Sequence, residues 1–124
     1  MQAKSTKVVI VGASGYIGGM LISPLAQRFD EVRCVSRHPD RLPERLPSNA
    51  VAMQGDLLDP DSLEACVEGS HTAYYLAHSL DEGNNYSELE RRSAENFVSA
   101  ARSAELKRIV YVGALAQTSR GAVS

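Results

Sequence analysis

Three glycines spaced three residues apart form the pattern in this chain that best suits a chemical task. They are Gly12, Gly15 and Gly18, and the β-branched segment VVIV (residues 8–11) stands directly before them. Glycine lets the backbone turn sharply and lets another molecule approach it closely. Where such glycines join a buried strand to a helix, the unpaired amides and the positive dipole end of the helix suit a diphosphate. The sequence therefore predicts a dinucleotide site at this junction, with the junction amides free to bind it.

Each glycine has its own predicted task. Gly12 permits the turn, Gly15 lets the ligand approach the backbone, and Gly18 lets the helix pack closely on the strand. The spacing differs from the commoner G-x-G-x-x-G, and taken alone it also fits a tight strand-to-helix connection without a ligand. Three neighbours of the glycines are further candidate cofactor-binding residues, namely Ser14, Tyr16 and Ile17.

A serine and an arginine occupy the position at which the ribose of a dinucleotide is recognised. Ser36 and Arg37 end the second predicted strand, about twenty residues beyond the glycines. An acid there would hold the 2′-hydroxyl of NAD, whereas a guanidinium can bind a 2′-phosphate through two parallel hydrogen bonds. Arg41 adds charge in the following loop. We therefore expect NADP(H) rather than NAD(H), the alternative being that Arg37 is a solvated loop residue.

Segments typical of buried strands alternate along the chain with segments typical of helices. A proline-rich stretch, residues 38–49, interrupts the alternation, and Pro24 is expected to kink the first helix. This order predicts an α/β fold: a Rossmann-like, doubly wound parallel sheet of about five strands, in the order 3-2-1-4-5 and in three αβα layers. The predicted strands are residues 7–11, 31–36, 50–54, 72–77 and 108–112, and the predicted helices are residues 14–29, 59–68 and 86–104.

Four segments resemble those of a known family, in the same order. The segment GASGYIGG behind VVIV is similar to the glycine motif of the short-chain dehydrogenase/reductase proteins, and most closely to their extended or atypical branch, which includes NmrA-like NAD(P)-binding proteins. The other segments are GDLLD (residues 55–59), AYYLAHS (73–79) and AENFVSAARSAELKRIVYVGAL (94–115). The resemblance covers nearly the whole chain and implies an NAD(P)-binding Rossmann domain.

The resemblance also implies roles for residues behind the third and fourth predicted strands. It places Asp56 against the adenine amino group and Leu57 over the adenine ring, although Asp56 also fits a turn residue that binds its own backbone. It places Ala77 beside the ribose and the diphosphate. It directs His78 toward the nicotinamide end, the alternative being a solvated loop position.

The pair that moves protons in hydride-transferring members of that family is absent from this chain. They use a tyrosine whose pKa is lowered by a lysine four residues further on. None of the five tyrosines is followed by lysine at that distance, and the only lysines are Lys4, Lys7 and Lys107. Gly113 and Ala114 stand where the family commonly has hydroxyl side chains. No catalytic residue is therefore assigned.

The composition is that of one ordinary globular domain. The 124 residues suffice for a single domain, residues 1–124, which we expect to be the N-terminal part of a longer protein. A formal net charge of −2 argues against a general nucleic-acid surface. The first apolar run is too short for a signal peptide or a membrane span, so we expect a cytoplasmic protein. Cys34 and Cys66 match no metal or redox spacing and are predicted to be buried thiols.

Three functions remain open from the sequence. The first is the binding of NADP(H), or less favourably NAD(H), as the cofactor half of an oxidoreductase or epimerase that acts on a carbonyl or sugar-like substrate. The second is a non-catalytic, NmrA-like module that senses the redox state of the nucleotide. The third is a Rossmann-like fold that binds no ligand. The expected partners are a dinucleotide and an unidentified small-molecule substrate, without nucleic acid or membrane, and a homodimer stays open as the assembly.

Overall fold

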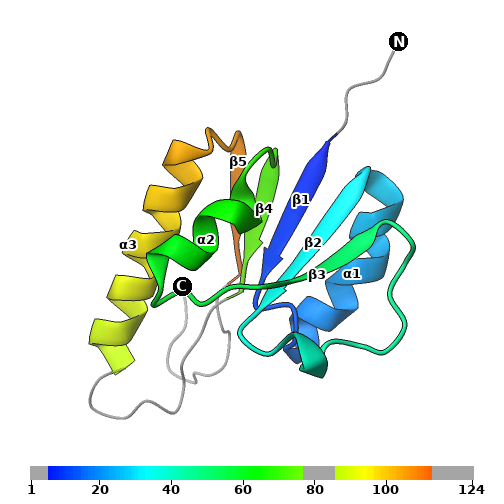
Figure 1. Cartoon of the computed structure of the whole chain (residues 1–124), viewed down its shortest axis with the longest axis horizontal. Coiled ribbons are helices and arrows are strands. Elements are labelled where there is room, and N and C mark those ends of the chain that lie inside the picture. The colour runs from blue at the N-terminus through cyan, green and yellow to red at the C-terminus, as the bar shows by residue number, and fades with distance from the viewer. Residues whose placement is uncertain (1–5, 77–85, 113–124) are drawn as a thin grey trace, which may run out of the picture.

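The computed structural model describes residues 6–76 and 86–112, which form a central sheet with helices on both sides (Figure 1). Strands and helices alternate in these residues, as predicted. In chain order they are β1 (Lys7–Val11), α1 (Tyr16–Arg28), β2 (Glu31–Ser36), the 3₁₀ helix η1 (Pro39–Arg41), β3 (Ala50–Gln54), α2 (Pro60–Val67), β4 (Thr72–Tyr75), α3 (Tyr86–Ser103) and β5 (Arg108–Tyr111).

All neighbouring strands are parallel, and their order is β3-β2-β1-β4-β5, which confirms the predicted order. Val11, the last residue of β1, pairs with Val35 of β2 and with Tyr75 of β4. The carboxyl ends of these strands therefore meet at one edge of the sheet. Ligands of open α/β sheets bind outside this edge, where the strand order reverses, and the glycines follow β1 there.

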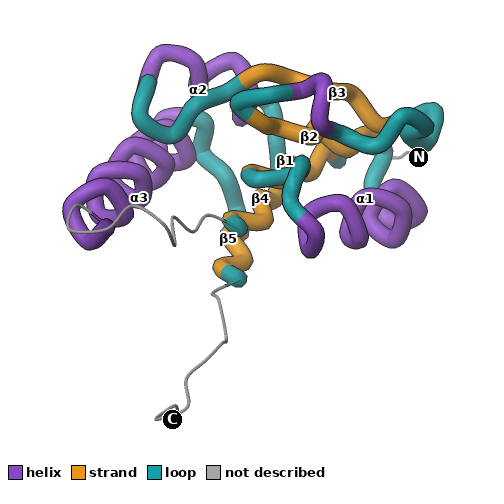
Figure 2. Tube along the Cα trace, turned by 90° about the horizontal axis from the view of Figure 1, so that it is seen from below, coloured by secondary structure: helices purple, strands orange, loops and turns teal. Residues whose placement is uncertain are grey.

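Alternate residues of β1 face the two helical layers. Val8 and Ile10 pack against α1, whereas Val9 and Val11 pack against α2 and α3. All four side chains are buried, because a parallel strand covered on both faces needs apolar residues at every position. Figure 2 shows α1 on one side of the sheet and α2 and α3 on the other, so the predicted three layers are confirmed.

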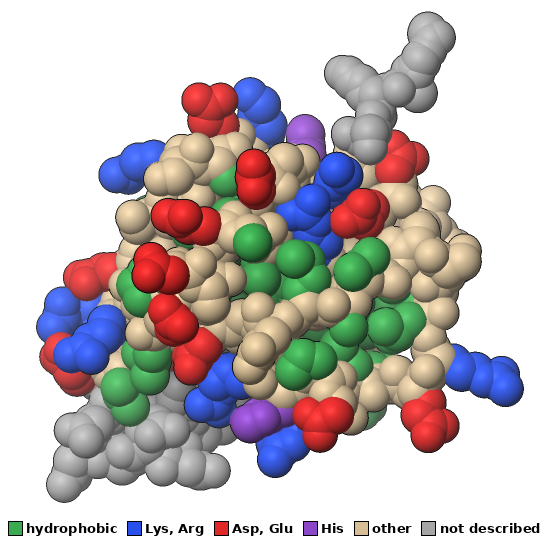
Figure 3. All heavy atoms as spheres, in the orientation of Figure 1, with side chains coloured by type: hydrophobic (Ala, Val, Ile, Leu, Met, Phe, Trp, Pro, Cys, Tyr) green, Lys and Arg blue, Asp and Glu red, His purple; other side chains and the backbone are tan. Residues whose placement is uncertain are grey.

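The layer of α2 and α3 leaves part of its face of the sheet uncovered. Hydrophobic side chains reach the surface over β2 and β3 (Figure 3), and Val51 of β3 is among the exposed ones. Arg33 of β2 ties this region to the end of α2, because its guanidinium bonds the Glu31 carboxylate at 3.0 Å and the carbonyl oxygen of Cys66 at 3.0 Å. The first half of β2 is thereby held against the end of α2.

β1, β2 and β3 have the predicted bounds, and the ends of the other elements differ from the predicted ones by at most two residues. α1 begins at Tyr16 instead of residue 14, because the preceding residues form the turn after β1. β4 ends at Tyr75 instead of residue 77. α1 continues through Pro24 to Arg28, and Pro24 lies on its exposed side, where water can replace the hydrogen bond that proline cannot donate.

Both cysteines are buried free thiols, as predicted, and we expect them to resist thiol reagents in the native chain. Burial raises the pKa of Cys34 to about 11. Burial also raises the pKa of Cys66, although the nearby positive charge of Arg33 acts in the opposite direction. The thiolate is the reactive form, so a thiol kept protonated and buried reacts slowly. Titration with Ellman's reagent at pH 8 should detect both thiols only after unfolding in guanidinium, and rapid reaction of the native chain would contradict their burial.

Candidate cofactor site

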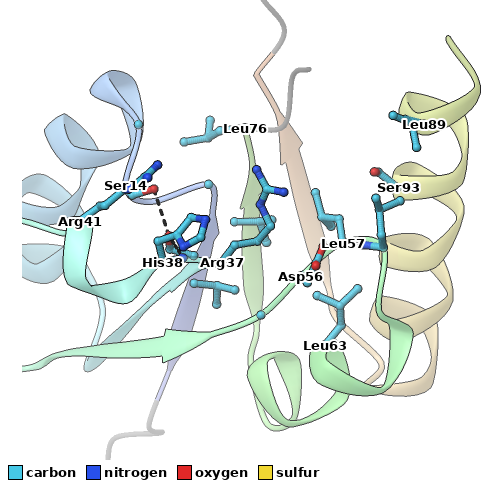
Figure 4. A pocket seen from close by; sticks show the side chains of 17 residues that line it. Ser14, Arg37, His38, Arg41, Asp56, Leu57, Leu63, Leu76, Leu89 and Ser93 are labelled. Carbon is cyan, nitrogen blue, oxygen red and sulfur yellow. Dashed lines mark hydrogen bonds between the residues drawn. The ribbon is translucent and has the colours of Figure 1, made fainter. Parts of the chain in front are cut away.

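A cavity of about 370 Å³ lies at the edge of the sheet where β1, β2 and β3 end. Three segments surround it (Figure 4): the glycine turn (residues 12–15), the basic turn (residues 36–41) and the GDLLD loop (residues 55–59). α3 adds the side chains of Leu89 and Ser93 from the opposite side. The cavity is thus located where ligands of such sheets bind.

The cavity brings together part of the predicted site. The predicted site residues that line it are Gly12, Ser14, Gly15, Ser36, Arg37, Asp56 and Leu57. Gly18 is buried inside α1. Tyr16 and Ile17 do not line the cavity, because the first turn of α1 directs their side chains to the surface, where they are 83% and 49% exposed. Ala77 and His78 lie outside the described residues.

Of the three glycines of the motif, Gly12 and Gly18 are needed for packing within the protein, and Gly15 is not. Gly12 has a φ of +96°, which side chains disfavour, and a Cβ there would lie 3.0 Å from the Leu76 carbonyl oxygen. A Cβ on Gly18 would collide with the Gly12 carbonyl oxygen and lie 2.8 Å from the Ala13 Cα. A Cβ on Gly15 would meet only the Gly12 carbonyl oxygen, at an ordinary 3.5 Å. The fold therefore does not require glycine at position 15, whereas a ligand in the cavity would.

The expectation that all the junction amides are free is wrong. The amides of Gly12 and Ala13 both donate to the Val35 carbonyl oxygen at 3.1 Å, and the amide of Gly15 donates to the Gly12 carbonyl oxygen at 3.1 Å. The turn at Gly12 causes this, because it directs the first two amides toward β2 and the third toward the Gly12 carbonyl oxygen. The donors suited to an anion are those of the first turn of α1, which have no acceptor within the helix.

The start of α1 is also suited to negative charge. Gly15 occupies the N-cap position and supplies no side-chain hydrogen bond to the first amides. The first turn contains no acidic residue that could neutralise the positive end of the helix dipole. An anion beside Gly15 would therefore meet unsatisfied donors and a favourable potential.

The basic turn brings Arg37, His38 and Arg41 to the cavity wall. The Arg41 amide donates to the His38 carbonyl oxygen at 2.9 Å, which folds the turn back on itself. Figure 4 shows the Arg37 guanidinium reaching into the cavity between the glycine turn and the GDLLD loop. In the part of the chain that the structure describes, no carboxylate forms an ion pair with Arg37 or Arg41. Both guanidinium groups therefore remain available to an anionic ligand.

The GDLLD loop is fixed by its own hydrogen bonds. The Asp56 Oδ1 accepts the Leu58 amide at 2.9 Å, so Asp56 does have the turn-forming contact that the sequence left open. The Ser62 hydroxyl accepts the Asp56 amide at 2.9 Å, and the Asn96 side chain of α3 donates to the Leu57 carbonyl oxygen at 2.7 Å. These contacts hold Asp56 and Leu57 at the cavity wall.

Several residues of the cavity wall escaped the sequence analysis. His38 follows Arg37 directly, but a histidine in a proline-rich stretch carries no pattern that separates a site from a solvated loop. Leu89 and Ser93 belong to the regular apolar face of α3, which is typical of a helix packed on a core. Their position beside the cavity depends on how far α3 extends past the sheet. The periodicity of the sequence does not predict that distance.

The buried tyrosine of β4 is a core residue. Tyr75 packs edge-to-face on Phe97, with ring centroids 5.0 Å apart. Burial, with smaller contributions from Glu90 and Tyr111, raises the pKa of Tyr75 to about 12, so its phenol stays protonated at neutral pH. Tyr75 does not line the cavity.

Residues 6–76 and 86–112 contain neither a membrane-spanning helix nor a cluster of metal ligands. None of the helices there is both long and apolar enough to cross a membrane. No group of three or more histidine, cysteine, aspartate or glutamate side chains in those residues could hold a metal ion.

The chain matches a family model described as NAD(P)H-binding over residues 12–122, which begins at the first glycine of the turn. It is 31% identical over 115 residues to a 3 beta-hydroxysteroid dehydrogenase/Delta 5-->4-isomerase of Mycobacterium tuberculosis, which covers 85% of this chain and 30% of that protein. It is 27% identical over 124 residues to cinnamoyl-CoA reductase 1 of Petunia hybrida, covering 93% of this chain and 37% of that protein. The chain thus spans about a third of the length of these relatives.

Solved structures of other proteins share this fold. Uronate dehydrogenase from Agrobacterium tumefaciens superposes with a TM-score of 0.75 at 23% identity, over 86% of this chain and 40% of that one. A Rossmann-fold NAD(P)-binding family protein from Shigella flexneri gives a TM-score of 0.73 at 22% identity, over 86% and 50% of the two chains. The glycine turn and the uncapped start of α1 agree with the family model. The chain therefore belongs to the NAD(P)H-binding family of Rossmann-fold proteins, within the short-chain dehydrogenase/reductase superfamily.

Proposed function

We propose that this chain binds NADP(H) in preference to NAD(H), as the cofactor-binding part of a larger oxidoreductase or epimerase. The observation that carries the preference is the Arg37 guanidinium, which reaches into the cavity at the end of β2 and has no carboxylate partner among the described residues. The ribose of a dinucleotide lies at this position in the fold. A carboxylate there would repel a 2′-phosphate, whereas Arg37, with Arg41 beside it, attracts one.

The rest of the cavity fits the remaining groups of the dinucleotide. The first turn of α1 would bind the diphosphate beside Gly15, where the protein leaves room for a ligand. Asp56 and Leu57 would hold the adenine, since Oδ1 of Asp56 is already bonded to Leu58 and Oδ2 is left to accept the adenine amino group. We propose that Ala77 lies beside the ribose and the diphosphate, and that His78 reaches toward the nicotinamide end of the cofactor.

The cofactor would supply or accept a hydride, and this chain contributes binding and orientation. The 3 beta-hydroxysteroid dehydrogenase and the cinnamoyl-CoA reductase to which it is similar are each about three times as long, which favours an enzyme whose acid/base lies in a further part of the protein. On this view residues 1–124 form one cofactor domain at the N-terminal side, and the substrate is a carbonyl or sugar-like compound.

A second candidate is a nucleotide sensor without catalysis. The observation that favours it is the sequence after the fifth strand, where Gly113 and Ala114 stand in place of the hydroxyl side chains common in the family. A sensor must bind the oxidised and reduced nucleotides with different affinities, because a ligand of equal affinity for two states shifts no equilibrium. Comparable dissociation constants for NADP⁺ and NADPH would therefore argue for the enzyme, and strongly unequal ones for the sensor.

Calorimetric titration of the chain with NADPH and with NADH tests the main proposal. We expect NADPH to bind at least about tenfold more tightly, which corresponds to about 1.4 kcal/mol. Absence of binding by both nucleotides would end the cofactor proposal for these residues. Equal affinities would leave the cofactor site in place and remove the role of Arg37.

A further inference from the structure

Ser36, the last residue of β2, is a buried polar residue in the cavity wall and is only 5% exposed. Its hydroxyl accepts the His38 amide at 3.0 Å and forms a hydrogen bond with the Ser14 hydroxyl at 3.0 Å (Figure 4). Its carbonyl oxygen accepts the Gly55 amide at 3.0 Å. One residue therefore connects the basic turn, the glycine turn and the GDLLD loop.

The chemistry of the groups fixes one of these hydrogen bonds and leaves the other two-way. An amide N–H can only donate, so the Ser36 hydroxyl accepts from His38. In its bond with the Ser14 hydroxyl either group can donate, because each hydroxyl has one proton and two acceptor lone pairs. The exposed side chain of Ser14 lines the cavity, so this bond links Ser36 to the cavity surface. Hydrogen bonds linked in this way strengthen one another.

The same hydroxyl restricts Arg37. This residue lies between Ser36 and His38, so the bond from the His38 amide to the Ser36 hydroxyl closes a small ring around the Arg37 backbone. The other bond of the hydroxyl fixes that ring against Ser14 of the glycine turn. The position of the guanidinium relative to the diphosphate-binding turn thus depends on one buried hydroxyl.

We propose that Ser36 is a positioning residue for NADP(H), an inference that rests on the proposed function. Its hydroxyl is engaged by two protein partners and contacts no part of the nucleotide. It holds Arg37 and Ser14 in a fixed relation, so that the 2′-phosphate and the diphosphate are bound by one rigid unit. The role assigned to Ser36 from the sequence, direct contact with the cofactor, is thereby replaced by an indirect one.

The test compares NADPH and NADH binding to the Ser36→Ala chain by calorimetry. We expect Ser36→Ala to weaken NADPH binding by about three- to tenfold and NADH binding by less, because only NADPH carries the phosphate that Arg37 meets. Ser36→Thr keeps the hydroxyl and should retain the preference for NADPH. Ser36→Cys keeps the side-chain size with a weak acceptor, and it serves as the second variant if the alanine chain does not fold.

Ser70 provides the matched control. It is 6% exposed, and its hydroxyl accepts a hydrogen bond from Arg33, away from the cavity. Ser70→Ala should leave the ratio of the NADPH and NADH dissociation constants unchanged, even if it lowers the free energy of unfolding.

A double-mutant cycle with Arg37→Ala separates positioning from a general loss of structure. If Ser36 acts through Arg37, adding Ser36→Ala to the Arg37→Ala chain leaves the NADPH-to-NADH ratio as it is. Equal weakening of both nucleotides by Ser36→Ala, or additive effects on the ratio, would overturn the inference while the proposed function stands. A wild-type chain that binds neither nucleotide, or binds both equally, would overturn the proposed function or its NADP preference, and this inference with it.

Discussion

Replacing Gly15 with valine is expected to abolish the binding of both NADPH and NADH while the chain stays folded. Gly15 has φ −79° and ψ 174°, an extended conformation that a β-branched residue adopts readily. Its Cβ would meet only the Gly12 carbonyl oxygen, at 3.5 Å, so the fold accommodates the substitution. The two added methyl groups would occupy the space beside the first amides of α1, where the diphosphate must lie. Calorimetry should then detect no binding, and the thermal unfolding midpoint should stay close to that of the wild type.

Two other glycines make this experiment specific. A Cβ on Gly19 meets nothing within 4 Å, so Gly19→Val, four residues further along α1, should bind both nucleotides as the wild type does. A Cβ on Gly18 would collide with the Gly12 carbonyl oxygen, so Gly18→Val should lower the free energy of unfolding instead. Normal nucleotide binding by Gly15→Val would show that the diphosphate does not lie at the glycine turn.

The predictable part of this fold has a simple physical origin. A strand covered on both faces must be apolar at every position, so β1 is recognisable as a continuous β-branched run. The short connections and the alternation with helices then restrict the sheet to a parallel, right-handed arrangement, and the strand order follows. The glycines at positions 12 and 18 were also predictable, because a turn with positive φ and a close helix-strand contact both exclude side chains.

The details of the site depended on tertiary contacts that no local pattern carries. Spacing suggested free amides at the junction, but whether the amides of Gly12 and Ala13 meet water or the Val35 carbonyl oxygen depends on how β2 lies beside the turn. Ser36 was identified as a site residue for its position at the end of β2. Its burial and its bond to Ser14, 22 residues earlier in the chain, are the basis of the positioning role that we propose for it.

Replacing Arg37 with alanine is expected to weaken NADPH binding by about 1.5–3 kcal/mol, or about 10- to 150-fold, if its hydrogen bonds to the 2′-phosphate are charge-assisted. NADH binding should change little, because the 2′-hydroxyl carries no charge. Calorimetric titration of both nucleotides into wild-type and Arg37→Ala chains measures the difference directly. Arg41→Ala should have a smaller effect in the same direction, since Arg41 reaches the cavity from one turn further on.

Arg45 supplies the control that removes the same charge from the same connection. It is exposed and does not line the cavity, so Arg45→Ala should leave the preference for NADPH intact.

Raising the salt concentration should reduce the preference of the wild type for NADPH, because ions screen the attraction between an exposed guanidinium and a phosphate. The Arg37→Ala chain should lack most of that salt dependence. If Arg37→Ala weakens the binding of NADH and of NADPH by the same factor, the guanidinium contacts a part that both nucleotides share. Another residue would then bind the 2′-phosphate.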